Sequence, residues 1–327
     1  MKNNNNILSA VIPVFNEGLM IKQSVQRVDR VLTDSGIPHE IILIDDGSTD
    51  HSWAEIQSCV NTMAGVKAIK LSRNFGKESA LCAGLNLVKG DCCVCLDSDM
   101  QHPPEIIPQM YQLWLNEGYE VVEGVKSNRG KESLSYKLSA GLFYKVLQTT
   151  SGIDLNNASD FRLLDRNALM AWQAMPEKQT FFRGMSSWIG FQRTQVEFEV
   201  AEREMGTSKW SFTNLVKLAV QGVTSYTAAP LYASAFMGAA LLLAFFVLLC
   251  QTFIMKALGY AADGFTTVIA LQLVIGGALM LSVGIIGIYI EKIYEEVKGR
   301  PRYIVQQQLE NPVFYANTSS AQVSNKE

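Results

Sequence analysis

The sequence predicts an α/β protein with a mostly parallel sheet, followed by two helices that cross a membrane. Short apolar runs alternate with amphipathic stretches through the first 125 residues, and such alternation is typical of βαβ units. Nearer the C-terminus, residues 218–255 and residues 264–290 contain no charged side chain. Each run exceeds the ~20 residues that a helix needs to cross a bilayer, so we expect two spans.

Five strands, with helices between them, are expected in the N-terminal part. The apolar runs that predict strands are residues 7–15, 40–46, 66–72, 92–97 and 120–125. Helices are expected after the first strand to about residue 35, after the polar cluster at 48–50, after the third strand to about residue 88, and over 104–117. Later patterns predict an amphipathic helix over 133–149, a strand over 196–200, a basic loop over 203–210 and a polar helix over 291–299.

Polar clusters follow four of the predicted strands, at residues 13–17, 45–50, 73–77 and 97–101. Ligands of parallel sheets bind at the carboxyl ends of the strands, so these clusters should converge on one crevice. No G-x-G-x-x-G follows the first strand and no Walker lysine motif occurs, which argues against a dinucleotide or P-loop site. The crevice instead offers Arg73 and Lys77 for phosphate and Phe15 as a wall for a base.

The stretch Asp97-Ser98-Asp99 supplies the carboxylates of this crevice, with Gln101 two residues further on. Side chains alternate along a strand, so Asp97 and Asp99 can point to the same side. Two close carboxylates repel each other unless a cation lies between them, and oxygen ligands of this kind suit Mg²⁺ or Mn²⁺. A lone D-x-D is more often a solvated turn. The neighbouring polar clusters favour the metal site here.

Charge and cysteine content limit the other classes of function. The net charge of −3 and the lack of a basic stripe with interleaved aromatics give no reason to expect nucleic acid. Three of the six cysteines crowd one predicted strand, which suits buried thiols in a reducing compartment better than disulfides or zinc. Residues 1–6 are polar, so no cleaved signal is expected.

The basic residues around the two spans predict their orientation in the membrane. Between the spans, Lys256 is the only basic residue, whereas Lys292, Lys298, Arg300 and Arg302 follow the second span. By the positive-inside rule, the C-terminal tail and the large N-terminal part both face the cytoplasm. We therefore expect a multi-pass protein of the cytoplasmic (inner) membrane.

These patterns divide the chain into four parts. We expect a catalytic domain over residues 1–210, which includes an amphipathic interfacial helix at about 133–150. A juxtamembrane amphipathic helix over 211–230 and a two-helix transmembrane region over 231–290 follow. Residues 291–327 form a cytoplasmic tail that is rich in Asn, Ser and Thr and is expected to be disordered after about residue 312.

Eight blocks of the sequence, in order and spacing, resemble the polyprenyl-phosphate glycosyltransferases of family 2. This family includes bactoprenol glucosyltransferases and dolichol-phosphate mannose synthase. The blocks are VIPVFNE at 11–17, DDGSTD at 45–50, RNFGKE at 73–78, DSDMQHPPE at 97–105, DFRLL at 160–164, RGMSSWIG at 183–190, GTSKW at 206–210 and YEEVKGRP at 294–301. The match covers roughly residues 7–305.

The resemblance implies a GT-A fold and an enzyme that transfers a sugar, with inversion, from a nucleotide-sugar to a membrane polyprenyl (undecaprenyl) phosphate. UDP-glucose is the first choice of donor, because several blocks look most like bactoprenol glucosyltransferases. Relatives with these spans form membrane tetramers, so the resemblance also implies a homo-oligomer. The product would be a lipid-linked sugar donor for modification of cell-envelope glycans.

The resemblance also assigns roles to individual positions. The residues expected to hold the nucleotide-sugar are Pro13, Phe15, Glu17, Asp46, Arg73, Lys77, Asp97, Ser98, Gln101, Arg203 and Lys209. The metal ligands are Asp97, Asp99 and Gln101, and the residues expected at the lipid phosphate are Lys126, Arg129 and Ser133. The catalytic candidates are Asp99, Asp160 and Arg162. Asp160 is either a base or a residue that orients Arg162 or Lys209.

Three positions depart from the family pattern. Ser98 stands where a small apolar residue is usual, His102 where Asp or Asn is common, and Ser159 where Gly usually precedes the Asp-Phe-Arg. None of these removes a ligand. Ser159 affects the geometry expected around Asp160.

Other classes of protein fit the sequence less well. A processive polysaccharide synthase would share the front half, but such enzymes usually carry a Q-x-x-R-W block that is missing here. A transporter subunit would need ionisable residues along its path, and neither span contains one. A soluble oxidoreductase conflicts with the spans and with the missing dinucleotide fingerprint.

Overall fold

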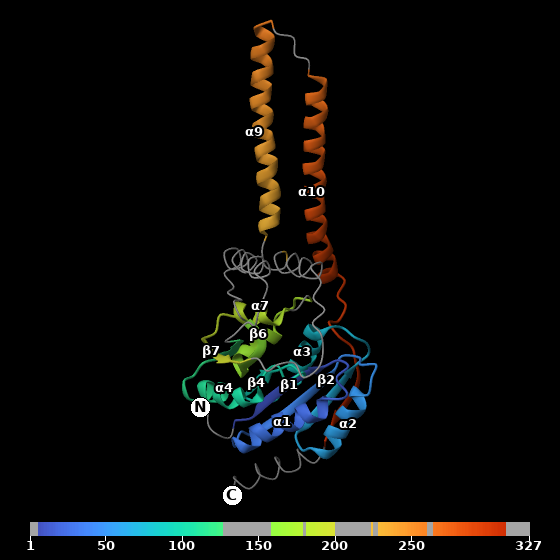
Figure 1. The fold of residues 1–327 in the computed structure, drawn as a ribbon, viewed down its shortest axis with the longest axis vertical. Coiled ribbons are helices and arrows are strands. Elements are labelled where there is room, and N and C mark those ends of the chain that lie inside the picture. Colours follow the sequence, from blue (N-terminus) through green and yellow to red (C-terminus); the bar gives the residue numbers. More distant parts are fainter. Residues whose placement is uncertain are drawn as a thin grey trace. The chain divides into compact units, whose positions relative to one another are not determined.

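The computed structural model describes residues 6–126, 158–178, 181–199, 224, 228–259 and 264–311. The chain divides into two compact units, and each is described by itself. One unit contains Met1–Ala140, Ile153–Ser208 and Pro301–Glu327, and the other contains Gly141–Gly152 and Lys209–Arg300. Figure 1 shows a sheet with its helices in the first unit and two long helices in the second.

The described part of the first unit is built on an eight-stranded sheet in the order β7-β5-β6-β4-β1-β2-β3-β8. Parallel pairings join β1 to β2 and β4, β2 to β3, and β5 to β7. Antiparallel pairings join β6 to β4 and β5, and β8 to β3. The strands are β1 (Leu8–Val14), β2 (His39–Asp45), β3 (Val66–Leu71), β4 (Cys92–Cys95), β5 (Val121–Lys126), β6 (Ala158–Asp165), β7 (Arg193–Phe198) and β8 (Val305–Glu310). The predicted α/β class with a mostly parallel sheet is confirmed.

Helices cover both faces of this sheet (Figure 1). They are α1 (Ile21–Asp34), α2 (Ser52–Thr62), α3 (Lys77–Leu85), α4 (Ile107–Asn116), which follows the short η1 (Pro104–Ile106), α6 (Arg166–Gln173) and α7 (Phe182–Trp188). Because side chains alternate along a strand, Ile12 of β1 belongs to the core cluster that contains residues of α1, α2 and α4, whereas Val11 belongs to the cluster that contains residues of α3, α6 and α7. The sheet is therefore buried between two apolar cores, which explains the continuous apolar runs of its parallel strands.

Two strands and two helices of this domain were not predicted, and a third strand differs in its bounds. The sequence pattern did not indicate β6, α6, α7 or β8, and β7 begins at Arg193 rather than at residue 196. In β6, the side chains of Ser159, Asp160 and Arg162 are polar yet buried, so the strand lacks the apolar run that revealed its neighbours. The cysteines behave as expected, since all six are free and five are buried.

The chain after the second long helix returns to the sheet instead of forming only a tail. β8 pairs with β3 along a register from Lys67–Glu310 to Leu71–Val305. Ahead of β8, the Ser72 amide donates to the Ile304 carbonyl at 2.9 Å. The domain predicted for residues 1–210 therefore also contains residues 301–311.

The second unit contains the two predicted spans as helices α9 (Ala229–Ala257) and α10 (Phe265–Val297). Both are long and apolar enough to cross a membrane, and neither buries its apolar window within the described structure. The predicted polar helix over 291–299 is the end of α10, which stops before Gly299 at φ 65° and Pro301. The predicted amphipathic helix at 133–150 lies outside the described residues, and so does the one at 211–230 apart from residues 224 and 228–230.

Candidate active site

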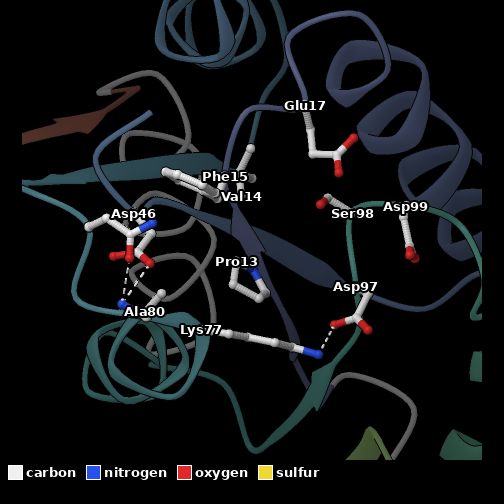
Figure 2. Close-up of a pocket in the computed structure, with 12 residues that line it drawn as sticks. Pro13, Val14, Phe15, Glu17, Asp46, Lys77, Ala80, Asp97, Ser98 and Asp99 are labelled. Atoms are coloured by element: carbon white, nitrogen blue, oxygen red, sulfur yellow. Dashed lines mark hydrogen bonds and ion pairs between the residues drawn. The ribbon is translucent and has the colours of Figure 1, made fainter. Parts of the chain in front are cut away.

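The carboxyl ends of β1, β2, β3 and β4 surround a cavity of about 280 Å³ (Figure 2). Each of the four predicted polar clusters contributes to its wall. The lining residues are Pro13, Val14, Phe15, Glu17, Asp46, Asn74, Gly76, Lys77, Ala80, Asp97, Ser98 and Asp99. The predicted convergence on one crevice is thus confirmed by the structure.

The loop after β1 is held in place by hydrogen bonds to the loop after β2. Asn16 has φ 55°, and its side-chain oxygen accepts from the Thr49 amide at 2.9 Å. The amide of the next residue, Glu17, donates to Ser52 Oγ at 2.8 Å. Asn tolerates this left-handed conformation better than most residues. The turn presents Phe15, 44% exposed, as an aromatic wall of the cavity.

Asp46 joins the loop after β2 to the loop after β3. Its carboxylate accepts from the amides of Phe75 and Gly76 at 2.8 and 2.9 Å. Burial raises the pKa of Asp46, although the two amide donors oppose the shift. Gly47, at φ 68°, permits the close approach of the loops, because a Cβ there would lie 2.4 Å from the Arg73 carbonyl carbon.

Arg73 is placed differently from the prediction. Its guanidinium stacks on the Phe75 ring at 4.4 Å from the centroid, and Arg73 is not among the residues that line the cavity. A direct contact from Arg73 to a bound phosphate would therefore require its side chain to leave this ring.

The turn after β4 brings Asp97, Ser98 and Asp99 to the cavity, as Figure 2 shows. Met100 adopts φ 57° in this turn, and the Gln101 amide donates to Asp99 Oδ1 at 3.2 Å. Gln101 itself does not line the cavity. Both carboxylates thus face the same space, which fits the predicted metal site, whereas the predicted ligand Gln101 lies beside it.

His102 supports this turn from behind. Its buried ring stacks on Phe161 at 5.3 Å between centroids and meets Phe198 edge-on at 5.7 Å. The Asp97 amide donates to His102 Nδ1 at 3.3 Å. The histidine therefore fixes the backbone of Asp97 against β6 and β7.

A row of charged side chains links the cavity to β6 and α7. Lys77 Nζ lies 2.5 Å from Asp97 Oδ1 and 2.6 Å from Asp160 Oδ2. On its other side, Asp160 accepts from Arg183 Nε at 2.6 Å and from Arg183 Nη2 at 3.1 Å. Burial alone would raise the pKa of Asp160, but the hydrogen bonds and charges of Arg183 and Lys77 hold that pKa well below its ordinary value.

This environment bears on the two roles left open for Asp160. A carboxylate that is held so firmly in its charged form is a weak base, which favours the orienting role. The residues it contacts are Lys77 and Arg183, whereas the predicted partners were Arg162 and Lys209. Arg183 is the first residue of the block RGMSSWIG at 183–190. Nothing in the sequence between the two residues indicated that Arg183 pairs with Asp160.

Arg162 does not reach the cavity. It is fully buried, its Nε donates to the Ser159 carbonyl at 3.2 Å, and its Nη1 donates to the Arg183 carbonyl at 3.1 Å and to Ser186 Oγ. Its charge faces Glu123 Oε1 at 3.4 Å. The predicted catalytic candidate instead braces β6 against β5 and α7.

Glu78 is a further buried acid beside this row that the sequence analysis did not single out. Its carboxylate accepts from the Phe182 amide at the start of α7 at 2.7 Å. Burial, with the nearby charge of Asp160, raises the pKa of Glu78 to about 7. Glu78 therefore links α3 to α7 directly behind the cavity.

Several predicted site residues fall outside the described residues. These are Arg129, Ser133, Arg203 and Lys209, and of Lys126 only the backbone at the end of β5 is described. Within the described part of the chain, no three His, Cys, Asp or Glu side chains gather as a ready-made metal centre. Two carboxylates that leave positions for water and phosphate oxygens are nevertheless a common arrangement for Mg²⁺.

Comparison with known proteins places the chain in a family. Residues 9–172 match the family model described as Glycosyl transferase family 2. An uncharacterized glycosyltransferase, YkcC, of Bacillus subtilis is 37% identical over 94% of this chain and 96% of its own length. Bactoprenol glucosyl transferase of Shigella phage SfII is 33% identical over 91% of this chain and 97% of its own. The undecaprenyl-phosphate 4-deoxy-4-formamido-L-arabinose transferase of Klebsiella pneumoniae is 33% identical over 93% and 94%. The chain belongs to glycosyltransferase family 2 and is a glycosyltransferase.

Proposed function

We propose that this enzyme transfers glucose from UDP-glucose to a membrane polyprenyl phosphate, with inversion at the sugar. The observation that carries the proposal is the cavity that Phe15, Asp46 and Lys77 line together with the pair Asp97 and Asp99. An aromatic wall, a cation and two carboxylates suit a base, a diphosphate and a divalent metal respectively. The names of the relatives from Shigella phage SfII and Klebsiella pneumoniae support a polyprenyl-phosphate acceptor.

In this proposal the nucleotide occupies the β1–β2 side of the cavity. Phe15 offers its exposed face to the base. Asp46 and Glu17 supply acceptor oxygens for the base or the ribose hydroxyls, and both line the same cavity as Pro13. The hydrogen bonds among the loops keep these groups in place before the donor binds, which reduces the entropy that binding must overcome.

Asp97 and Asp99 would hold Mg²⁺ or Mn²⁺, and Gln101 would contribute from beside the cavity. Their carboxylate oxygens face one space at the end of β4, and such ligands suit these hard cations. When bound, the metal supplies Lewis-acid stabilisation of the charge that develops on the leaving diphosphate. Ser98 and Lys77 also line the cavity and would contact the diphosphate.

The acceptor needs positioning more than it needs a base. A phosphate monoester is already an anion near pH 7, since its second pKa is about 6. Its attack from the face opposite the leaving group gives inversion, and the protein contributes alignment and charge stabilisation. In this scheme Asp160 orients Lys77 and Arg183. Lys126, Arg129 and Ser133 are proposed to bind the lipid phosphate, and Arg203 and Lys209 the phosphates near the transfer point.

The two apolar helices support a reaction at a membrane. We propose that α9 and α10 span the cytoplasmic membrane, with both termini and the catalytic domain on the cytoplasmic side, because the basic residues cluster after α10. The proposal includes assembly as a homo-oligomer, with a tetramer as the expected form. Cysteine labelling of intact cells tests the topology, and an external C-terminus would refute it.

The donor and the acceptor are tested together. Membranes that contain the enzyme are incubated with a panel of labelled nucleotide-sugars, and the lipid is then extracted and its product identified. We expect one glucose per lipid from UDP-glucose, in the inverted configuration. Transfer from another nucleotide-sugar alone would correct the donor. A growing polymer would favour the alternative, a processive polysaccharide synthase.

A further inference from the structure

Lys77 lies at the point where the cavity meets the charged row behind it. It is the first residue of α3, and its side chain runs along the cavity toward Asp97 (Figure 2). Its ammonium is close to two carboxylate oxygens, at 2.5 Å from Asp97 and 2.6 Å from Asp160. Burial alone would lower the pKa of Lys77, but the two carboxylates raise it above its ordinary value, so the group stays charged.

The two partners of Lys77 are not equivalent. Asp160 has a second cation, because Arg183 contacts it through two nitrogens. Within the described part of the chain, Asp97 has Lys77 as its one lysine or arginine partner, and the His102 ring nitrogen lies 3.8 Å away. The side chain of Asp97 is 25% exposed and that of Asp160 5%. Lys77 is therefore the cation that neutralises the more open carboxylate.

We infer that Lys77 is an exchangeable counterion, which neutralises Asp97 in the empty site and turns to the diphosphate when a divalent cation takes its place. This inference rests on the proposed function of the site. A metal ion and an ammonium beside the same carboxylate oxygen repel each other. A lysine head is a compact charge on a flexible four-carbon stem, and 39% of this side chain is exposed to the cavity side or solvent. It can therefore exchange partners without movement of α3.

The exchange couples metal and nucleotide binding. Without nucleotide, Lys77 competes with the metal for Asp97 and weakens metal binding. With nucleotide present, the diphosphate gives Lys77 a new partner, so that each ligand strengthens the binding of the other by the same factor. Asp160 remains paired with Arg183. Its contact with the Lys77 ammonium keeps that side chain within reach of both Asp97 and the diphosphate.

The test is ligand binding to the full-length protein in detergent, with Lys77→Met as the main variant. Methionine retains a similar stem and removes the charge. We expect Mn²⁺ alone, measured by electron paramagnetic resonance, to bind roughly ten-fold more tightly to the variant than to the wild type. We expect UDP, measured by calorimetry at saturating Mn²⁺, to bind roughly ten-fold more weakly, because a charge-assisted contact is lost.

Two further variants keep the result interpretable. Lys70→Met removes a nearby lysine that lies 4.0 Å from Asp45 and over the Trp53 ring, and that is not among the residues that line the cavity. Both dissociation constants should stay at their wild-type values in this control. Lys77→Arg retains the charge and should bind Mn²⁺ alone as weakly as the wild type does.

The outcomes separate this inference from the proposed function. If Lys77→Met binds Mn²⁺ alone no more tightly than the wild type, while the wild type still binds UDP, the counterion role is wrong and the donor site stands. If the wild type binds no UDP in the presence of Mn²⁺, the proposed function itself is wrong.

Discussion

Two regions border the cavity, and they are held together by different forces. The loops after β1, β2 and β3 are joined by hydrogen bonds from backbone amides to short polar side chains, such as Asn16 and Asp46. The region of β6 and α7 is instead joined by buried charges, with Asp160 between Lys77 and Arg183 and Arg162 beside Glu123. We call these the loop region and the charged region.

The difference predicts how each region responds to substitution. A neutral hydrogen bond contributes about 0.5–1.5 kcal/mol, and the loop region contains several that act side by side. A buried charge whose partner is removed costs roughly 3–5 kcal/mol. The loop region should therefore tolerate single substitutions outside the reacting groups. A single substitution in the charged region should instead destabilise the whole region.

The largest effect is expected at Asp97 and Asp99, whose carboxylates line the cavity that both regions border. Replacement of Asp97 or Asp99 by Asn removes a proposed metal ligand, and at Asp97 it also removes the charge that Lys77 neutralises. We expect the rate of sugar transfer to fall by roughly 10³-fold or more, by analogy with the loss of an electrostatic stabiliser of the transition state. EDTA should have the same effect on the wild type until Mg²⁺ or Mn²⁺ is restored. Full activity in chelator would exclude the metal.

The next effect concerns stability and tests the charged region directly. Arg162→Met leaves Glu123 buried without its cation, so we expect the free energy of unfolding to fall by roughly 3–5 kcal/mol. The double variant Arg162→Met, Glu123→Gln should recover part of this loss, because no buried charge remains unpaired. Thermal unfolding of the full-length protein measures both. If Arg162→Met is as stable as the wild type, the two regions do not differ in how strongly substitutions destabilise them.

The same contrast explains what the sequence could reveal. The loop region follows strands with continuous apolar runs, and its polar clusters stand next to those runs, so both strands and site were predictable from neighbouring residues. In the charged region, Lys77 is 83 residues from Asp160, and Glu78 is 104 from Phe182. No local pattern specifies such pairs. Buried Ser159, Asp160 and Arg162 also concealed β6, since a polar strand resembles a loop until its partners are known.

β8 was concealed for a similar reason. Its sequence, Val-Gln-Gln-Gln-Leu-Glu, contains few apolar residues, and most of its side chains are exposed at the edge of the sheet. Its stability comes from the backbone pairing with β3 and from Arg302, which donates to Cys82 Sγ at 3.2 Å and to the Met175 carbonyl. Contacts of this kind depend on residues more than 100 positions away and leave no periodic signal.

A smaller effect is therefore expected from Arg302→Met. The change removes a charge-assisted contact to a carbonyl, which is worth roughly 1.5–3 kcal/mol, and keeps the apolar stem. Because β8 is joined to the residue that precedes the loop at 73–77, UDP affinity should weaken slightly along with the melting temperature. Arg300→Met, two residues earlier and outside these contacts, is the matched control. If Arg302→Met and Arg300→Met have the same UDP affinity and the same melting temperature, the contacts of Arg302 do not support the loop region.

The smallest effect is a dependence of stability on pH near neutrality, which arises from Glu78 beside the charged region. Burial raises the pKa of Glu78 to about 7 in the folded protein, above the ~4.3 of an unfolded glutamate. Below about pH 4 both states bind the proton, so the stabilising difference is fully present. Between about pH 4 and 7 the unfolded state loses its proton first, and stability falls as pH rises.

Glu78→Gln is neutral at every pH and retains an acceptor for the Phe182 amide, so it should lack this fall. The melting temperature of the wild type, relative to the variant, should drop by a few degrees between pH 5 and 8. If the wild type and the variant gave parallel melting curves, Glu78 would be ionised in the folded protein across this range, and the charged region would owe no pH dependence to it.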